Sequence, residues 1–228
     1  MDIGRALNYT FEDQEGTNKG LITVIIGLIP LVNLAAIGWG LDLIRNMLDG
    51  ATYPMPDWND LGSQFVERWV SGLMIAIAAF IYYLPMLIIN IILNGVLNGV
   101  FRVGSGDELS FLFGAGMCVS CITGLLGIVY QAVIWLPLSV GLMRYARTRN
   151  FGNFFDIGRN INLALENLST MLVLALYWIV YSLVMFFIGL IPCVGWLIAL
   201  ASVGINVIVM GHLLGQAAIE IAAKTQQS

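Results

Sequence analysis

Four of the long segments that lack Asp, Glu, Lys and Arg constrain the fold of this chain more than any other feature. They cover residues 70–100, 111–143, 168–190 and 194–218. A hydrocarbon core of about 30 Å requires about 20 apolar helical residues, and each run is long enough. Polar and apolar residues do not alternate as they do in the strands of an outer-membrane barrel. We therefore predict an all-α, polytopic integral membrane helix bundle in which residues 1–228 form a single domain.

The charge content supports a membrane location and excludes one class of partner. Only 11% of the residues are charged and 59% are hydrophobic, whereas a globular domain carries about 25% charged residues. So few charges cannot cover a water-facing surface, and lipid must be the solvent for much of the chain. The net charge is −4 and no basic block is present, so we expect no nucleic-acid partner. The N-terminus lacks the basic start of a signal peptide, and we expect the first apolar segment to be retained.

A short pattern, aspartate followed by an apolar residue and glycine, recurs three times ahead of apolar runs. The copies begin at Asp2, Asp60 and Asp156. Apolar residues then follow at steps of four, which places them on one helical face. This internal repeat predicts three amphipathic interfacial helices in one leaflet, over residues 1–19, 57–69 and 153–167. We expect the aspartates to cap these helices rather than to act as acid-base catalysts.

The sequence Gly-Leu-Ile-Pro occurs twice and predicts two Pro-broken hairpins. Proline lacks a backbone donor and disfavours helix at the residue before it. At Pro192 the flanks are long, which predicts a turn between two spanning helices. At Pro30 two interpretations of residues 20–48 remain open: one spanning helix kinked at the proline, or a re-entrant hairpin with the proline at its tip. We favour the re-entrant form, since it leaves only Arg102 outside and groups the other basic residues, including the basic segment 144–151, on the cytoplasmic side.

The two longest runs exceed the thickness of a membrane. Residues 70–100 and 111–143 would each form a helix of about 48 Å. We expect either a strong tilt or a helical hairpin that projects beyond the outer surface, with kinks at Pro85 and Pro137.

Two patterns supply candidate contacts for a partner or a polar path. One is an asparagine stripe with neighbouring glycines, which could also simply project into water. The other is a small-residue face, which lets helices approach closely within this bundle or with another protein. The residues are Asn90, Asn94, Asn98, Gly95, Gly99, Gly211 and Gly215.

The residues that could carry chemistry are few. Cys118 and Cys121 form a C-x-x-C, and Cys193 follows Pro192, so a redox or metal site is conceivable. No histidine or carboxylate stands near them in sequence, and we expect packing thiols. His212 is expected to be a packing or interfacial residue rather than a proton relay. No zinc-ligand cluster, phosphate loop or nucleophile elbow is present, so we expect no enzyme, cofactor or metal site.

Several segments together resemble a known family. They are residues 2–13, the first Leu-Ile-Pro at 28–30, residues 55–60, and the start of the third predicted surface helix at 155–158. In this order they resemble the bacterial and archaeal membrane proteins grouped as domain of unknown function 4013. The resemblance implies a multi-pass membrane protein and supplies no activity or catalytic residues. The predicted arrangement of segments is also similar to that of membrane domains found beside glycerophosphodiester phosphodiesterases, although this chain has no room for such a catalytic domain.

These observations lead to a non-enzymatic function. We expect a subunit or scaffold of the cytoplasmic (inner) membrane, with both termini cytoplasmic, that associates with another membrane protein complex or with copies of itself. The alternative is a transporter or handling protein for a small solute or lipid. That alternative uses the broken helices at Pro30 and Pro192, because interrupted helices can form substrate sites.

Overall fold

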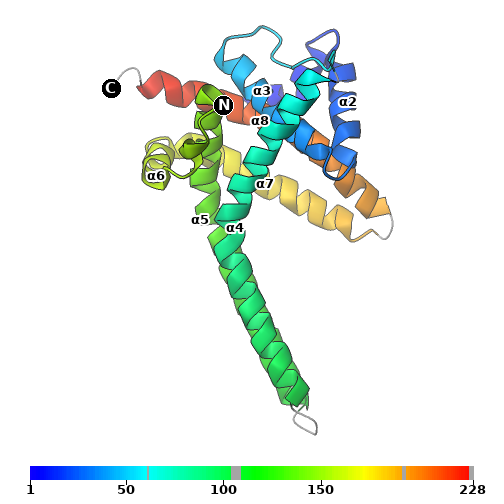
Figure 1. Ribbon diagram of the computed structural model, residues 1–228, viewed down its shortest axis with the longest axis vertical. Helices are drawn as coiled ribbons and strands as arrows, with labels where there is room; N and C mark the ends of the chain where they lie inside the picture. Colours follow the sequence, from blue (N-terminus) through cyan, green and yellow to red (C-terminus); the bar gives the residue numbers. More distant parts are fainter. Residues whose placement is uncertain (61, 104–108, 192–193, 226–228) are drawn as a thin grey trace.

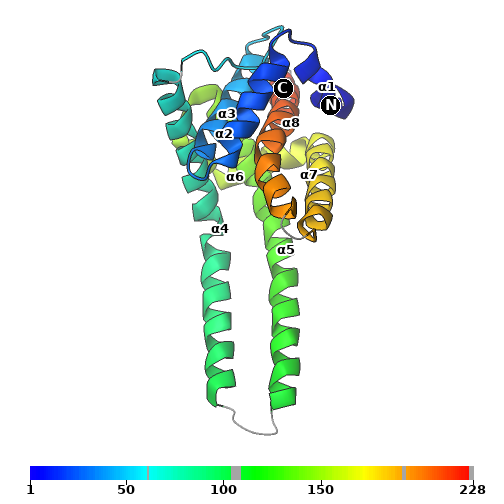
Figure 2. The same cartoon turned by 90° about the vertical axis from the view of Figure 1, so that its right-hand side faces the viewer.

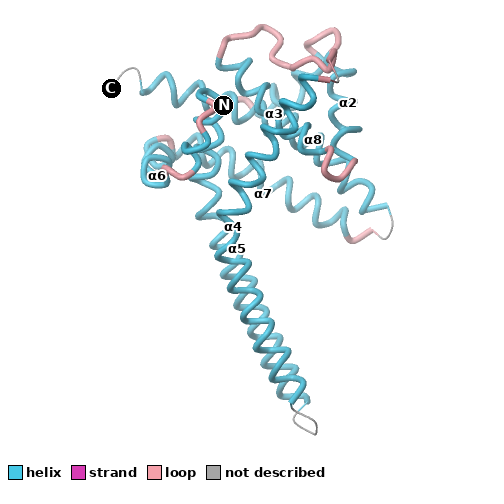
Figure 3. The backbone as a smooth tube through the Cα atoms, in the orientation of Figure 1, coloured by secondary structure: helices cyan, strands magenta, loops and turns pink. Residues whose placement is uncertain are grey.

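The structure, a computed structural model, describes residues 1–60, 62–103, 109–191 and 194–225, and all regular elements in these ranges are helical. In chain order they are α1 (Ile3–Asn8), the 3₁₀ helix η1 (Tyr9–Phe11), α2 (Gly16–Leu28), α3 (Asn33–Leu48), α4 (Ser63–Val103), α5 (Leu109–Thr148), the 3₁₀ helix η2 (Phe151–Phe154), α6 (Ile157–Glu166), α7 (Leu168–Gly189) and α8 (Val194–Thr225). The predicted all-α class is confirmed. A cluster of helices forms one end of the molecule, and α4 and α5 extend from it as a long pair (Figures 1 and 3).

Within the described residues, four helices contain segments long and apolar enough to cross a membrane. They are Ser63–Leu93, Cys121–Thr148, Leu168–Gly189 and Ala201–Lys224. The segments of α4, α5 and α7 keep much of their apolar surface uncovered, whereas that of α8 is mostly buried in the bundle. On α7, for example, Leu172, Leu183 and Phe186 each expose more than half of their surface. Such a surface is stable in lipid and not in water. The chain is therefore a polytopic membrane protein.

The helix α4 corrects one prediction. Residues 57–60 are not helical, and from Ser63 the helix continues without a break to Val103, with Pro85 inside it. Residues 63–69 are thus the first turns of a long helix rather than part of a separate surface helix. Neither Gly nor Pro occurs between Ser63 and Trp69, and a helix that has begun continues because each added residue gains a hydrogen bond.

Residues 20–48 form a helical hairpin rather than one kinked helix. The chain reverses between α2 and α3, where Leu31 adopts a φ of 68° and its carbonyl accepts a hydrogen bond of 2.8 Å from Trp69 Nε1. Pro30 is exposed at this tip. The other end of the hairpin is closed by an ion pair of 2.8 Å between Lys19, in α2, and Asp57, which follows α3.

Ion pairs connect the residues near the starts of α1, α4 and α6 to other helices at one end of the molecule. Arg149, just after α5, pairs with Glu67 of α4 at 2.8 Å, and Arg144 of α5 pairs with Asp156 before α6 at 3.0 Å. Glu220 near the end of α8 pairs with the Met1 amine at 3.0 Å. We call the charged residues of this end the polar layer; they are Asp42, Arg45, Glu67, Arg68, Arg144, Arg147, Arg149, Asp156, Arg159 and Glu220.

The repeated aspartates share only part of their predicted role. The Asp2 side chain caps α1 by accepting a hydrogen bond of 2.9 Å from the Arg5 amide. The Asp60 side chain accepts one of 2.7 Å from the Gly62 amide, at the entry to α4. The expected capping by Asp156 is wrong, since its side chain makes no capping hydrogen bond to α6 and instead faces Arg144. A nearby guanidinium offers a carboxylate a charge-assisted bond, which is stronger than a bond to a neutral amide.

Glycines allow α3 to approach α4 until their backbones touch. A Cβ on Gly38 would lie 1.9 Å from the Arg68 carbonyl oxygen, and a Cβ on Gly72 would lie 1.8 Å from that of Leu34. Next to this contact Trp39 is fully buried and donates a hydrogen bond of 2.8 Å to the Pro56 carbonyl. Close packing of this kind stabilises helices in lipid, where no hydrophobic drive brings them together.

The Lys19 ammonium stabilises the entry to α2 in a pH-dependent manner. It contacts Asp13 at 2.7 Å as well as Asp57, and its hydrogen bond holds the pKa of the Asp13 carboxyl below the usual 3.8. A depressed folded-state pKa contributes stability above the unfolded value, and this contribution is lost as the pH falls through the folded value. We therefore expect Lys19→Met to lower the melting temperature by a few degrees at pH 7, and the difference from wild type to shrink only below a pH of about 4. Thermal melts of the detergent-solubilised protein at pH 7 and pH 3 test this, and equal differences at both would contradict it.

Candidate functional site

The centre of the polar layer is Asp42 of α3, which faces three arginines from three parts of the chain. Its carboxylate lies 3.0 Å from Arg68 Nε, 3.5 Å from an Arg149 nitrogen and 3.8 Å from an Arg45 nitrogen. The Arg68 side chain is only 8% exposed. Its guanidinium also donates to the Asp57 carbonyl at 2.6 Å and lies 4.8 Å from the centre of the Trp58 ring. Two of its three nitrogens therefore donate to oxygen acceptors, and its face lies on an indole ring, which offsets part of the cost of burying the charge.

A second junction joins the ends of the chain. Glu220 accepts a hydrogen bond of 2.6 Å from the Thr170 hydroxyl in addition to its pair with the Met1 amine. About two helical turns before it on α8, His212 is 3% exposed and stacks on Tyr9 with ring centres 4.2 Å apart. Gln216 Nε2 lies 3.1 Å from His212 Nδ1. The histidine is therefore a packed residue without a carboxylate partner among the described residues, which agrees with the packing role expected for it.

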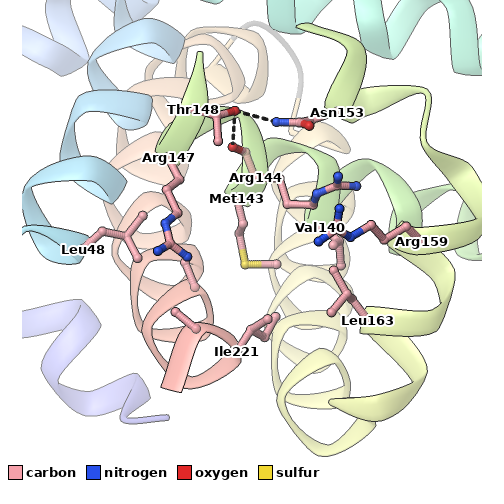
Figure 4. A pocket seen from close by; sticks show the side chains of 12 residues that line it. Leu48, Val140, Met143, Arg144, Arg147, Thr148, Asn153, Arg159, Leu163 and Ile221 are labelled. Carbon is pink, nitrogen blue, oxygen red and sulfur yellow. Dashed lines mark hydrogen bonds between the residues drawn. The ribbon is translucent and has the colours of Figure 1, made fainter. Parts of the chain in front are cut away.

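The remaining arginines of the polar layer surround a cavity of about 320 Å³, which we call the arginine pocket. It is lined by Arg144 and Arg147 of α5, Arg159 of α6, Thr148 and Asn153, and by apolar residues of four helices: Leu48, Val140, Met143, Leu163, Ala218, Ile221 and Ala222. In Figure 4 Arg147 lies on one side of the Met143 side chain, and Arg144 and Arg159 lie on the other. Asn153 donates a hydrogen bond of 2.6 Å to the Thr148 hydroxyl along one wall. The pocket thus combines cations at its rim with an apolar floor.

The local fold explains how Arg159 reaches the two arginines of α5. After α5 the chain turns back through η2, where the Asn150 side chain accepts a hydrogen bond of 2.9 Å from the Gly152 amide. Phe154 is fully buried and anchors this turn to the core. The turn is held further by Asn160, whose amide donates 2.8 Å to the Asn153 carbonyl while its oxygen accepts 2.6 Å from Arg144.

The structure separates the two groups of candidate partner contacts. Gly95 is exposed, with no atom within 4 Å of a Cβ built on it, and Asn90 donates a hydrogen bond of 2.9 Å to the Met86 carbonyl within α4. Gly211 and Gly215 are buried against α3, where added Cβ atoms would meet Leu43 at 3.0 Å and Met47 at 2.3 Å. The α8 glycines therefore pack the inside of the bundle, whereas Gly95 is open to an outside partner.

The other candidates lie outside what the structure describes. They are the side chains of Asn94, Asn98, Cys118 and Cys193, and the surroundings of Gly99. Cys121 is exposed and forms no disulfide. Among the described residues, no group of three His, Cys, Asp or Glu side chains could hold a metal ion.

The arginine pocket was not predicted from the sequence. Residues 144–151 are the most basic segment, but this segment served only to predict which side of the membrane is cytoplasmic. The usable clue was Arg159, a basic residue near the start of an amphipathic helix that directly follows that segment.

Comparison with known proteins identifies a family. A family model described as protein of unknown function (DUF4013) matches residues 21–194, which extend from α2 to the first residue of α8. No curated protein and no solved structure matches the chain. Since the match covers well over half of its length, the chain belongs to the DUF4013 family of proteins of unknown function.

Proposed function

We propose that this protein is a non-enzymatic membrane subunit that uses the α4–α5 hairpin to bind another integral membrane protein. The observation that carries the proposal is the length of these helices. α4 has 41 residues and α5 has 40. Even at a tilt of 40°, the upper end of the usual range, a core of about 30 Å accommodates only about 26 helical residues. Both helices are therefore too long for the bilayer alone.

The excess lies at the far end of the hairpin. Arg68 and Arg149 belong to the polar layer, which supports placing one membrane surface near the start of α4 and the end of α5. The remaining length projects beyond the opposite surface, away from every other helix (Figure 2). Residues 90–103 contain only one charged residue, Arg102, and residues 109–120 contain none. Apolar helix of this kind is unstable in water unless another protein covers it.

Exposed side chains support a partner along the lower hairpin. Ile91 and Ile92 on α4 and Leu125 and Leu126 on α5 each expose more than half of their surface. Gly95 and Gly124 have no atom within 4 Å of a built Cβ, so a partner helix could approach their backbones closely. The matching partner presents an apolar helical surface with small residues. The preference of basic residues for the cytoplasmic side supports an inner-membrane location with the polar layer and both termini in the cytoplasm.

Site-directed photo-crosslinking in native membranes tests the proposal. A photo-reactive phenylalanine analogue in place of Ile91 or Leu125 is expected to give one discrete adduct with a second membrane protein, which also co-purifies in stoichiometric amount. The analogue in place of Leu172 or Leu183, equally exposed on α7, is expected to give lipid adducts only. An adduct of twice the mass of this chain would replace the proposal with self-association, and lipid adducts at all four positions would reject it.

The second candidate, handling of a solute or lipid, is favoured by a different feature from the one expected. Pro30 lies at an exposed turn, where Trp69 donates a hydrogen bond to the Leu31 carbonyl, and it does not line the arginine pocket. Pro192 lies outside the described residues. Lipid handling draws its support instead from the arginine pocket.

A further inference from the structure

The arginine pocket has an unbalanced charge. Arg144 is engaged by Asp156 at 3.0 Å and by Asn160 at 2.6 Å. Arg147 and Arg159 are exposed, and neither forms an ion pair with any residue that the structure describes. One carboxylate therefore faces three guanidiniums that line one cavity. Like charges held together in this way favour an anion between them.

The walls of the pocket point to the chemistry of that anion. Guanidinium groups bind phosphate in a bidentate manner, and Arg147 and Arg159 have their donors available for this. Below them the floor is apolar, formed by Val140, Met143 and Leu163 among others. A soluble phosphate would gain nothing from such a floor, whereas the glycerol and upper acyl carbons of a phospholipid would be buried against it.

A second, apolar cavity lies further along α5, away from the polar layer. Leu136 lies one helical turn before Val140 on the same face of α5. It lines a cavity of about 590 Å³ between α5 and α7, together with Trp135, Met171, Ala175 and Trp178. Gln131 is the one side chain with an amide among the lining residues, and none is charged. This groove has the composition that suits an acyl chain.

We infer that the arginine pocket is a binding site for an anionic phospholipid. The phosphate lies between Arg147 and Arg159 at the level of the headgroups, the glycerol rests on Met143 and Leu163, and one acyl chain follows the groove between α5 and α7. The site joins α5, α6, α7 and α8, so the bound lipid fixes α6 on the membrane surface. The inference does not depend on the partner proposed for the α4–α5 hairpin.

Native mass spectrometry of the full chain from detergent tests the site. The protein is mixed with equal amounts of phosphatidylglycerol and phosphatidylethanolamine, and the retained lipid is measured as gas-phase activation rises. We expect wild type to retain phosphatidylglycerol. The double variant Arg147→Gln/Arg159→Gln is expected to retain at least about tenfold less of this lipid. Arg5→Gln removes one positive charge from an exposed residue of α1 outside the arginine pocket and is expected to match wild type.

Further measurements distinguish the loss of charge from a folding defect, and a bound lipid from a bound soluble anion. The double variant Arg147→Lys/Arg159→Lys keeps the charge and is expected to restore at least half of the binding, which a mere folding defect would not allow. Inorganic phosphate at millimolar concentration is expected to leave the lipid bound. Equal retention of both lipids, wild-type retention by the Gln double variant, or displacement of the lipid by inorganic phosphate would each overturn the inference, the last in favour of a soluble-anion site.

Discussion

Gly72→Ala is expected to lower the melting temperature of the purified protein by about 10 °C, equivalent to about 3 kcal/mol for a chain of this size. The added Cβ would lie 1.8 Å from the Leu34 carbonyl oxygen and 3.2 Å from the Gly38 nitrogen. Both atoms belong to backbone, so no side-chain rotation can relieve the overlap and α3 must move away from α4. Differential scanning fluorimetry in detergent measures the effect.

Gly95→Ala is the matched control, since it makes the same change in the same helix where nothing lies within 4 Å. It is expected to leave the melting temperature unchanged or to raise it slightly, because alanine favours helix more than glycine does. If Gly72→Ala melted like Gly95→Ala, α3 and α4 could not be in backbone contact at this point.

The second large effect is expected at Asp42. Asp42→Asn removes the described ion pairs of Arg45 and Arg68 and leaves Arg149 with Glu67. The Arg68 guanidinium, whose side chain is 8% exposed, then has no carboxylate partner among the described residues. Breaking a buried ion pair costs about 3–5 kcal/mol, and the 23% exposure of Asp42 places the expected loss near the lower limit, about 3 kcal/mol. Denaturant or thermal unfolding in detergent measures it.

Asp49→Asn provides the comparison for Asp42→Asn. Asp49 follows the same helix, is exposed, and forms no ion pair with the described residues. A change of less than about 0.5 kcal/mol is expected there. Equal effects of the two variants would show that the cluster around Asp42 contributes little to stability.

The sequence predicted the elements that depend on local composition. Charge-free runs are a property of consecutive residues, and α7, α8 and the long α4–α5 pair follow from them directly. The turn at Pro30 was foreseeable for the same reason, since proline acts on its immediate neighbours. The start of α4 was misjudged because the amphipathic pattern of 61–69 is the same whether that stretch lies alone or continues into a spanning helix.

The polar contacts were beyond local reasoning. Asp42 stands three residues before Arg45, which the sequence shows, but its other partners are 26 and 107 residues away. The arginine pocket could not be predicted for the same reason, because Arg159 and Arg144 line one cavity only when η2 has folded back and Phe154 is buried. Ion pairs across the chain are set by helix packing, and helix packing in this bundle is set by small residues whose partners a single sequence does not reveal.

The position of α8 has a consequence for how the protein is made. A Cβ on Gly204 would lie 2.5 Å from the Val24 Cα, and a Cβ on Gly40 would lie 2.9 Å from the Val207 side chain, so α8 completes the packing of α2 and α3. The ribosome finishes α2 and α3 well before it produces α8. The α2–α3 hairpin must therefore remain in the bilayer or beside the translocon with its glycine faces uncovered until α8 arrives. If synthesis stops before residue 204, membrane proteases are expected to degrade this hairpin.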